Sequence, residues 1–217
     1  MTNPRVRITD EKLLSDNWYV LKRYTFDYQQ ANGEWASQQR EAYDRGNGAT
    51  ILLHNPGADT VILTRQFRLP TYVNGNPSGM LIETCAGLLD DDHPDDAIRR
   101  EMEEETGYRI STVEKVMEAY MSPGSVTERL FFYLAEYSAD TSRAAGGGID
   151  EEEIDVLELP VSEAMRLITT GGIMDGKTIM LLYHLRLRQL ANGEEGRSNG
   201  FQSEKVSQRL TSKQIVH

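Results

Sequence analysis

The chain has 217 residues and a formal net charge of −11, with 39% hydrophobic and 26% charged residues. This length suffices for a full hydrophobic core, and no apolar run approaches the roughly 18 residues of a membrane helix, so we expect no membrane partner. The acidic balance argues against nucleic acid as a partner, because such binding depends on Lys and Arg that neutralise phosphates. The single cysteine, Cys85, excludes an internal disulfide framework; with no secretory signal expected, it favours a reducing, cytoplasmic location.

Residues 1–45 are predicted to form an antiparallel β arm ahead of the main core. Aromatic and β-branched residues fill the runs 18–21 and 24–28, and Asn32-Gly33 follows as a turn signal. A return strand is predicted at 40–43. The arm is therefore expected to be a small sheet of its own.

The main domain is predicted over 46–192. Short runs of apolar and β-branched residues predict buried strands, at 50–53, 60–63, 80–85, 113–120, 130–137 and 154–159. Polar, aperiodic sequence after Asn192 predicts a flexible tail over 193–217. Strands around an isolated central helix, with further helices at the end, indicate a mixed α/β sandwich, of the α+β kind, rather than regular βαβ alternation.

The central helix is predicted over 94–106. Pro94 suits the first helical position, Asp92 or His93 can cap the helix, and Gly107 suits the left-handed residue that ends many helices.

Two more helices are predicted at about 162–170 and 177–191. The second has a broad apolar face, formed by Ile179, Leu182, Leu185 and Leu190.

The helix 94–106 carries a cluster of carboxylates. Glu101, Glu104 and Glu105 follow one another at spacings of three and four, so their side chains share one face. Three like charges so close together repel one another unless a cation lies between them, and magnesium takes oxygen ligands. Spacing alone leaves the alternative of a solvated acidic face, in which Arg100 pairs with Glu104.

The stretch from Gly87 to Tyr108 resembles the Nudix box, the motif G-x5-E-x7-R-E-U-x-E-E-x-G-U in which U is a bulky apolar residue. Its second half, Arg100-Glu101-Met102-Glu103-Glu104-Glu105-Thr106-Gly107-Tyr108, matches at every fixed position. The first half is one residue short and has Asp92 or His93 where the family has a glutamate that supports the loop and helix. The resemblance implies a Nudix-type α/β/α sandwich and a hydrolase that cuts a phosphoric anhydride bond.

The same resemblance implies the metal chemistry. Magnesium, with manganese as a possible substitute, is expected on Glu101, Glu105 and the backbone carbonyl of Ala86, with Arg100 holding Glu104 in place. The family also places a carboxylate on a mobile loop, as metal ligand or general base. Here that carboxylate is assigned to Glu152, although its neighbours Glu151 and Glu153 leave the position ambiguous by one residue.

Segments outside the box point to a particular branch. Those that resemble the ADP-ribose pyrophosphatase branch are 65–68, 83–87 and 121–124; those that resemble the GDP-mannose pyrophosphatases of enteric bacteria are 43–50, 73–76, 145–148 and 175–178. The second resemblance covers about 8–190 and implies cleavage of GDP-mannose to GMP and mannose 1-phosphate. ADP-ribose hydrolysis and a non-catalytic nucleotide-sugar sensor are the alternatives, and the full set of box residues argues against the sensor.

The resemblance further implies a homodimer with exchanged arms and composite active sites. The positions that match substrate contacts are Trp18, Gln39, Arg40, Glu41, Arg68, Ala86, Gly87, Leu88, Glu105, Glu128, Glu151, Glu152 and Lys177. Trp18 is suited to stack on a base, and Arg40 and Arg68 to neutralise phosphate oxygens. Without the family, Trp18 is more often a core aromatic and the two arginines are more often surface or paired residues. Lys177, beside Gly176 at a helix start, is equally suited to be a solvated lysine.

Overall fold

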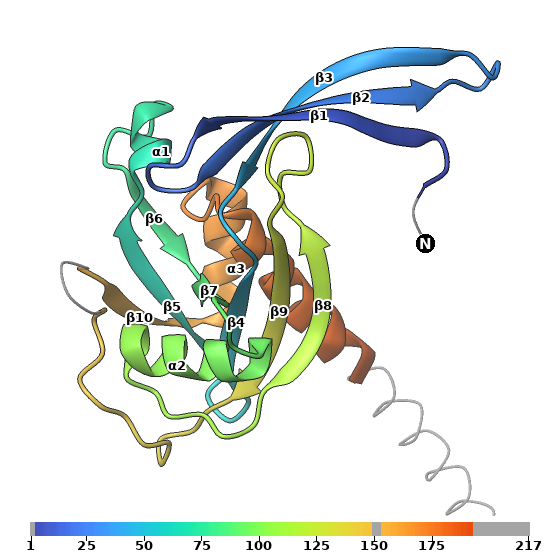
Figure 1. Cartoon of the computed structure of the whole chain (residues 1–217). Helices are drawn as coiled ribbons and strands as arrows, with labels where there is room; N and C mark the ends of the chain where they lie inside the picture. Colours follow the sequence, from blue (N-terminus) through green and yellow to red (C-terminus); the bar gives the residue numbers. More distant parts are fainter. Residues whose placement is uncertain (1–2, 149–152, 193–217) are drawn as a thin grey trace, which may run out of the picture.

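The computed structural model describes residues 3–148 and 153–192. In the first of these ranges an antiparallel sheet in the order β1-β2-β3 forms the arm, which extends away from the body (Figure 1). Its strands are β1 (Val6–Ser15), β2 (Val20–Gln29) and β3 (Trp35–Asp44). Strand β1 was not predicted, because nearly all of its residues are exposed and no apolar alternation marks it.

The described part of the main domain contains a mixed sheet with the central order β10-β5-β4-β9-β8. Its strands are β4 (Gly48–Asn55), β5 (Thr60–Phe67), β6 (Met80–Glu83), β7 (Cys85–Leu88), β8 (Glu114–Tyr120), β9 (Arg129–Glu136) and β10 (Asp155–Pro160). Strands β4 and β9 run parallel, and the other pairs are antiparallel. The predicted fold class, a mixed sheet preceded by an antiparallel arm, is confirmed.

Strands β4 and β5 diverge, and β6 and β7 fill the space between them (Figure 1). The two long strands pair only near their connection, from Leu53 to Asn55 on β4. Farther along, β7 pairs with the start of β4 and β6 with the end of β5. The single strand predicted at 80–85 is therefore two short strands, because each half has a different neighbour.

Helix α2 (Pro94–Thr106) covers one face of the sheet and has the predicted bounds. His93 is its N-cap, and its Nδ1 accepts from the backbone N–H of Asp95 at 3.4 Å. Gly107 ends the helix with φ 79°, the left-handed conformation that glycine adopts without strain.

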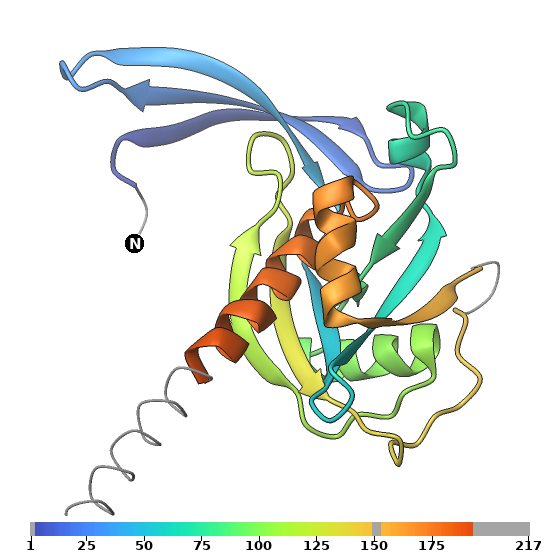
Figure 2. The same ribbon diagram turned by 180° about the vertical axis from the view of Figure 1, so that it is seen from behind.

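The opposite face is covered by α3 (Val161–Thr170) and by a helix over 176–192 (Figure 2). Alternation along β4 supplies both cores: Ile51 packs on the α2 side and Leu52 on the other side. None of the described helices is long and apolar enough to cross a membrane.

The two C-terminal helices lie where the sequence predicts them, and the structure departs from the helix predictions at two points. Leu190 is 51% exposed, so it does not belong to the buried face of the last helix with Leu182 and Leu185, which pack in the core. The short helix α1 (Leu69–Val73) was not predicted, because five residues are too few to show a helical period.

Replacement of Gly107 by Ala tests the close contact between the end of α2 and the 144–146 loop. A Cβ atom at Gly107 would lie 2.4 Å from the carbonyl oxygen of Ala144, whereas Gly33, which also has a positive φ of 88°, has no described atom within 4 Å. Gly33→Ala should lower the free energy of unfolding by about 1 kcal/mol through backbone strain. Gly107→Ala should lower it by roughly 2 kcal/mol more through overpacking. Urea unfolding of both variants measures the difference, and equal losses would contradict the contact.

Candidate active site

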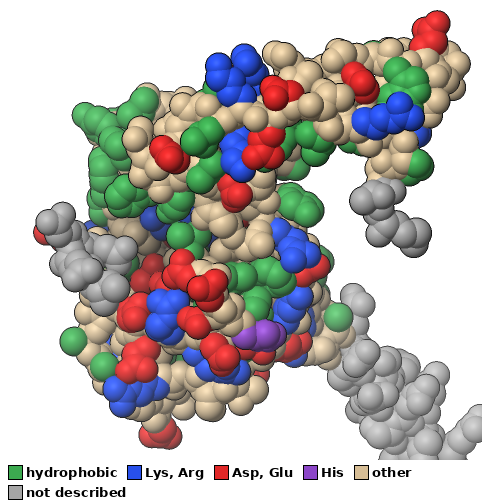
Figure 3. All heavy atoms as spheres, in the orientation of Figure 1, with side chains coloured by type: hydrophobic (Ala, Val, Ile, Leu, Met, Phe, Trp, Pro, Cys, Tyr) green, Lys and Arg blue, Asp and Glu red, His purple; other side chains and the backbone are tan. Residues whose placement is uncertain are grey.

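Helix α2 places the predicted carboxylates on the face that meets β7. Glu105 is 6% exposed, and the side chains of Glu101 and Glu104 are 18% and 29% exposed. Acidic side chains gather over this part of the molecule among basic ones (Figure 3). The alternative of a solvated acidic face therefore does not describe Glu105.

Glu105 is a buried carboxylate with an unsatisfied oxygen. Its Oε2 is buried and has no hydrogen-bond partner among the described residues. Burial raises its pKa to about 7, and the charge of Glu101 adds to the rise, while a hydrogen bond with Cys85 and the charge of Arg68 oppose it. Such an atom is costly in a folded protein unless a ligand satisfies it.

Gly87 lets Glu101 approach the backbone of β7. A Cβ atom at Gly87 would lie 2.1 Å from Cδ of Glu101, so any other residue here would displace the carboxylate. Ala86 and Leu88 flank this contact and pair with Thr50 and Gly48 of β4. The side chain of Glu101 therefore lies against the strand that carries Ala86.

The carboxylate oxygens of Glu101 and Glu105 fit a divalent cation. The described residues contain no group of three or more His, Cys, Asp or Glu side chains that could hold a metal. Of the predicted metal ligands, the described residues contain two carboxylates, Glu101 and Glu105, and the backbone carbonyl of Ala86. The unsatisfied Oε2 of Glu105 and the all-oxygen donor set suit a hard cation. Glu152 lies outside the described residues.

Arg100 was expected to pair with Glu104, but its nearest carboxylate is that of Glu101. Its NH1 lies 3.1 Å from Oε1 of Glu101 and 3.7 Å from Oε2 of Glu104, while its NH2 lies 3.5 Å from Oδ2 of Asp92. Asp92 therefore contacts the arginine of the box from the loop that lacks the family's glutamate, while His93 caps the helix.

Arg68 and Lys177 meet at one buried carboxylate, Glu83. Arg68 donates through Nε to Oε1 of Glu83 at 2.8 Å, and Lys177 reaches Oε2 at 2.5 Å. The side chain of Lys177 is only 13% exposed, so the reading of a solvated lysine is wrong. Burial lowers the pKa of Arg68, but the hydrogen bond and the charge of Glu83 outweigh it, and the charge of Glu105 adds to the rise.

The arm residues Arg40 and Glu41 line a hollow of about 560 Å³, together with Tyr120 and the 123–127 loop. Gln39, their neighbour on β3, bonds to the hydroxyl of Thr25 at 3.3 Å. Within one chain Arg40 and Glu41 therefore face the 120–127 region rather than α2, while the side chain of Gln39 contacts the arm itself.

Trp18 lies in the loop between β1 and β2 and is 84% exposed. Its nearest recorded aromatic contact is an edge-to-face one with Tyr19, at 6.1 Å between ring centroids. The expectation that it is a core aromatic is therefore wrong, and its ring is available for stacking.

Glu128 lies beside β4 and β7. Its side chain is 15% exposed, and its Oε1 is 3.5 Å from Nε of Arg45. A Cβ atom at Gly48 would come within 3.7 Å of that oxygen and 3.0 Å of the carbonyl oxygen of Gly87. The structure thus brings Glu128 close to Gly87.

Glu151 and Glu152 lie outside the described residues. The loop that leads to them is attached to the end of α2: the N–H groups of Gly147 and Gly148 donate to the carbonyls of Glu105 and Glu104 at 2.8 and 3.2 Å. The described part of the loop therefore ends beside the carboxylate helix.

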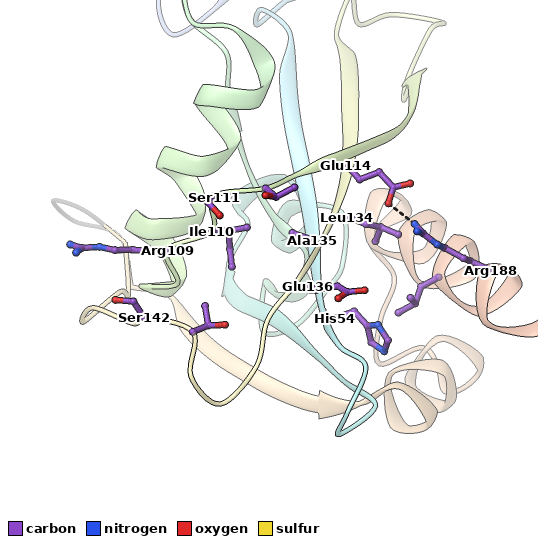
Figure 4. Close-up of a pocket in the computed structure, with 13 residues that line it drawn as sticks. His54, Arg109, Ile110, Ser111, Glu114, Leu134, Ala135, Glu136, Ser142 and Arg188 are labelled. Carbon is purple, nitrogen blue, oxygen red and sulfur yellow. Dashed lines mark hydrogen bonds and ion pairs between the residues drawn. The ribbon is translucent and has the colours of Figure 1, made fainter. Parts of the chain in front are cut away.

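A separate hollow of about 570 Å³ lies between the 109–112 loop, β9 and the last helix (Figure 4). Three of its charged residues are already paired: Arg188 lies 2.6 Å from Glu114, and Arg109 lies 2.7 Å from Glu103. None of the described residues predicted for the site lines it, so we do not place the active site there.

Glu83 was missed as a site residue. It is the only charged residue in the predicted strand 80–85, directly after the apolar residues Met80, Leu81 and Ile82. A charged residue inside a predicted buried strand must find partners, and this signal was available from the sequence.

The raised pKa of Glu105 predicts how stability depends on pH without metal. Between pH 4.5 and 7 the folded protein keeps a proton that the unfolded chain releases, so the free energy of unfolding falls as pH rises. A rise in pKa of this size corresponds to roughly 3 kcal/mol. In the presence of a chelator, wild type should lose about that much more than Glu105→Gln between pH 4.5 and pH 8, measured by urea unfolding. Glu163→Gln on α3 is the control, and parallel curves for wild type and Glu105→Gln would contradict the buried, unsatisfied carboxylate.

Comparisons with known proteins agree with the box residues. Residues 5–43 match the family model of the GDP-mannose pyrophosphatase NudK N-terminal domain, and residues 44–181 match the NUDIX domain model. A protein named GDP-mannose pyrophosphatase from Pectobacterium atrosepticum is 58% identical over 188 residues, which cover 87% of this chain and 97% of that protein. Proteins of the same name from Yersinia enterocolitica and Citrobacter koseri are 57% and 53% identical, covering 82% and 86% of this chain and 94% and 97% of their own.

A crystal structure of an ADP compounds hydrolase matches with a TM-score of 0.67 over 89% of this chain and 98% of that chain. At 17% identity this likeness concerns the fold. The family model covers more than half of the chain and the relatives are more than half identical, so the resemblance found at the box is confirmed. The chain belongs to the NUDIX family, within the group of the GDP-mannose pyrophosphatases.

Proposed function

We propose that this protein hydrolyses GDP-mannose to GMP and mannose 1-phosphate in a magnesium-dependent reaction, with manganese as a substitute. The observation that carries the proposal is the carboxylate pair Glu101 and Glu105 on α2, with Glu101 packed against Gly87 of β7, in a chain 53–58% identical to proteins named GDP-mannose pyrophosphatase. A sensor that only binds has no need of the complete box set.

Glu101, Glu105, the carbonyl of Ala86 and Glu152 are the proposed holders of the cation. When bound, the cation supplies positive charge against the pyrophosphate and lowers the pKa of a water molecule. Glu152 is also proposed as the general base, and its neighbours Glu151 and Glu153 are the alternatives for this role. A base on a loop suits a site that becomes complete when substrate arrives.

The remaining site residues bind and orient the substrate. Arg68 and Lys177 lie on the β6 side, where two cations suit the oxygens of a pyrophosphate. Arg100 restrains the side chains of Glu101 and Glu104, because it reaches both. Trp18, which is exposed, is proposed to stack on the guanine base, and Glu128 and the backbone of Gly87 to contact the substrate beside it.

We further propose a homodimer in which the arm of one chain completes the site of the other. The arm exposes large apolar side chains, among them Ile8 at 65%, Leu13 at 51% and Trp18 at 84%. Exposed apolar surface of this kind is typical of an interface. Arg40 and Glu41 do not face α2 within one chain, which also favours a second copy.

A cytoplasmic location and the absence of nucleic-acid and membrane partners remain predictions. They are supported by the net charge of −11 and by the single cysteine, Cys85, which is buried and free.

Side-by-side hydrolysis of GDP-mannose and ADP-ribose, with and without magnesium, tests the proposed reaction. We expect magnesium-dependent release of GMP and mannose 1-phosphate, faster than release of AMP from ADP-ribose, with the products resolved by chromatography. Glu105→Gln should lower kcat by a factor of 100 or more, on the order of the several kcal/mol that a bound cation contributes.

Three outcomes would change the assignment. A preference for ADP-ribose keeps the reaction class and discards the substrate. Tight binding of both compounds without cleavage favours the sensor. Full activity of Glu105→Gln contradicts the assignment of the active site to the carboxylates of α2.

Sedimentation of the full chain tests the dimer. At micromolar concentration we expect one species of about twice the chain mass, because the arm's apolar side chains are then covered. Leu13→Glu, a charge placed among those side chains, should shift the protein toward monomer. Leu187→Glu on the last helix, where the leucine is 67% exposed against 51% for Leu13, should not. A wild-type protein that sediments only as monomer contradicts the exchanged arms.

A further inference from the structure

Glu83 is among the most deeply buried charged side chains of the described structure, with 3% of its side chain exposed. Glu83 is the last residue of β6, which lies with β7 in the wedge between β4 and β5. Only Thr84 separates it from the start of β7. A buried carboxylate is costly unless charged partners surround it. Its partners therefore indicate what the carboxylate does.

Both carboxylate oxygens of Glu83 bind cations that belong to the proposed substrate site. Arg68 forms a two-point contact, from Nε to Oε1 at 2.8 Å and from NH2 to Oε2 at 3.2 Å. Lys177 binds Oε2 as well and also lies 3.0 Å from Oδ1 of Asp175. The two cations thus share one carboxylate, which fixes the distance between them.

Asp175 fixes the far side of this arrangement. Its Oδ2 accepts from the backbone N–H and the hydroxyl of Thr178, at 3.0 and 2.5 Å, and so caps the helix over 176–192. The hydroxyl oxygen of Thr178 in turn accepts from the backbone N–H of Thr84 at 2.7 Å. Helix, lysine and strand are therefore joined on both sides of Glu83.

The same chain of contacts continues to the strand that carries the proposed metal-binding carbonyl. The hydroxyl of Thr84 lies 2.8 Å from that of Thr50, which donates to the carbonyl of Cys85 at 3.0 Å. All three threonines, including Thr178, are at most 1% exposed. Buried, satisfied polar networks of this kind hold their members in one arrangement.

The charges agree with the geometry. Burial raises the pKa of Glu83, but the positive charge of Lys177 and the hydrogen bond and charge of Arg68 outweigh it, so that the pKa is lowered overall. Glu83 is therefore ionised at neutral pH and acts as an anion between two cations.

We propose that Glu83 is a positioning residue of the active site, which holds Arg68 and Lys177 at a fixed separation beside Glu105 so that both cations meet the pyrophosphate of the substrate. This inference rests on the proposed function and assigns a role to a residue that does not itself touch the substrate.

Positioning and simple charge balance lead to opposite expectations. If Glu83 only offsets the charge of two cations, its removal leaves the site more positive and strengthens binding of an anion. If it positions them, its removal lets the cations move apart and weakens binding, although the site has gained positive charge. A role in stability alone predicts a lower melting temperature and unchanged binding by the folded protein.

The experiment compares Glu83→Gln and Glu83→Asp with wild type in the full chain. Gln keeps the size and removes the charge, whereas Asp keeps the charge but is one methylene too short to contact both cations. The matched control is Glu163→Gln, which removes an ion pair of 2.7 Å with Arg166 on α3. Affinity is measured by calorimetry with the α,β-methylene analogue of GDP-mannose, which cannot be cleaved, and kcat and KM are measured with GDP-mannose.

We expect both Glu83 variants to bind the analogue about 10- to 100-fold more weakly and to lose kcat by a similar factor, with Glu163→Gln unchanged. In combination with Arg68→Gln, Glu83→Gln should add a smaller loss than it causes alone, because one of the two cations that it positions is already absent. Wild-type or tighter affinity in a folded Glu83→Gln protein overturns the proposal. If Glu83→Gln does not fold, wild-type affinity and kcat in Glu83→Asp overturn it equally.

The outcome is separable from that of the proposed function. A wild-type protein that neither binds the analogue nor cleaves GDP-mannose contradicts the substrate assignment; the same variants are then compared on ADP-ribose. Loss in the variants beside an active wild type supports Glu83 whichever sugar nucleotide is preferred.

Discussion

The divergence of β4 and β5 is the constraint on which the site depends. Two neighbouring strands that separate leave backbone groups without partners, and buried backbone groups must be paired. The short strands β6 and β7 supply these partners. As a result Glu83 lies buried in the middle of a sheet, where only specific partners make charge tolerable. Ala86 follows three residues later, in β7.

The two buried carboxylates, Glu83 on β6 and Glu105 on α2, differ in how their oxygens are satisfied. Glu83 is satisfied by Arg68 and Lys177, and its pKa is lowered although burial opposes this. Glu105 has an oxygen without a partner among the described residues, and burial raises its pKa to about 7. The satisfied carboxylate makes a fixed framework, while the unsatisfied one lowers the stability of the metal-free protein and is suited to binding a cation. Such local cost at a functional site is a common form of the conflict between stability and activity.

The arm is a small sheet that buries little of its own side-chain surface. Its strands pair with one another, yet few of their side chains are buried, and several large apolar groups are exposed. A small sheet with an unpacked face gains little stability from its own contacts. The arm therefore makes best physical sense when another surface covers it, and this requirement connects assembly with the arm residues Arg40 and Glu41.

The sequence by itself determined the elements whose signals are local. Pro94 and Gly107 marked the bounds of α2, the spacing of Glu101, Glu104 and Glu105 placed them on one face, and the box identified the family. Only the tertiary structure decided what depends on distant residues: the division of the run 80–85 into two strands, and the partners of Glu83, one of which, Lys177, is 94 positions away in the chain. It also decided that Trp18 is exposed and that Arg100 contacts Glu101 more closely than Glu104. Caps and periodicity act within a few residues along the chain, whereas burial and ion pairing depend on which strands and helices pack together.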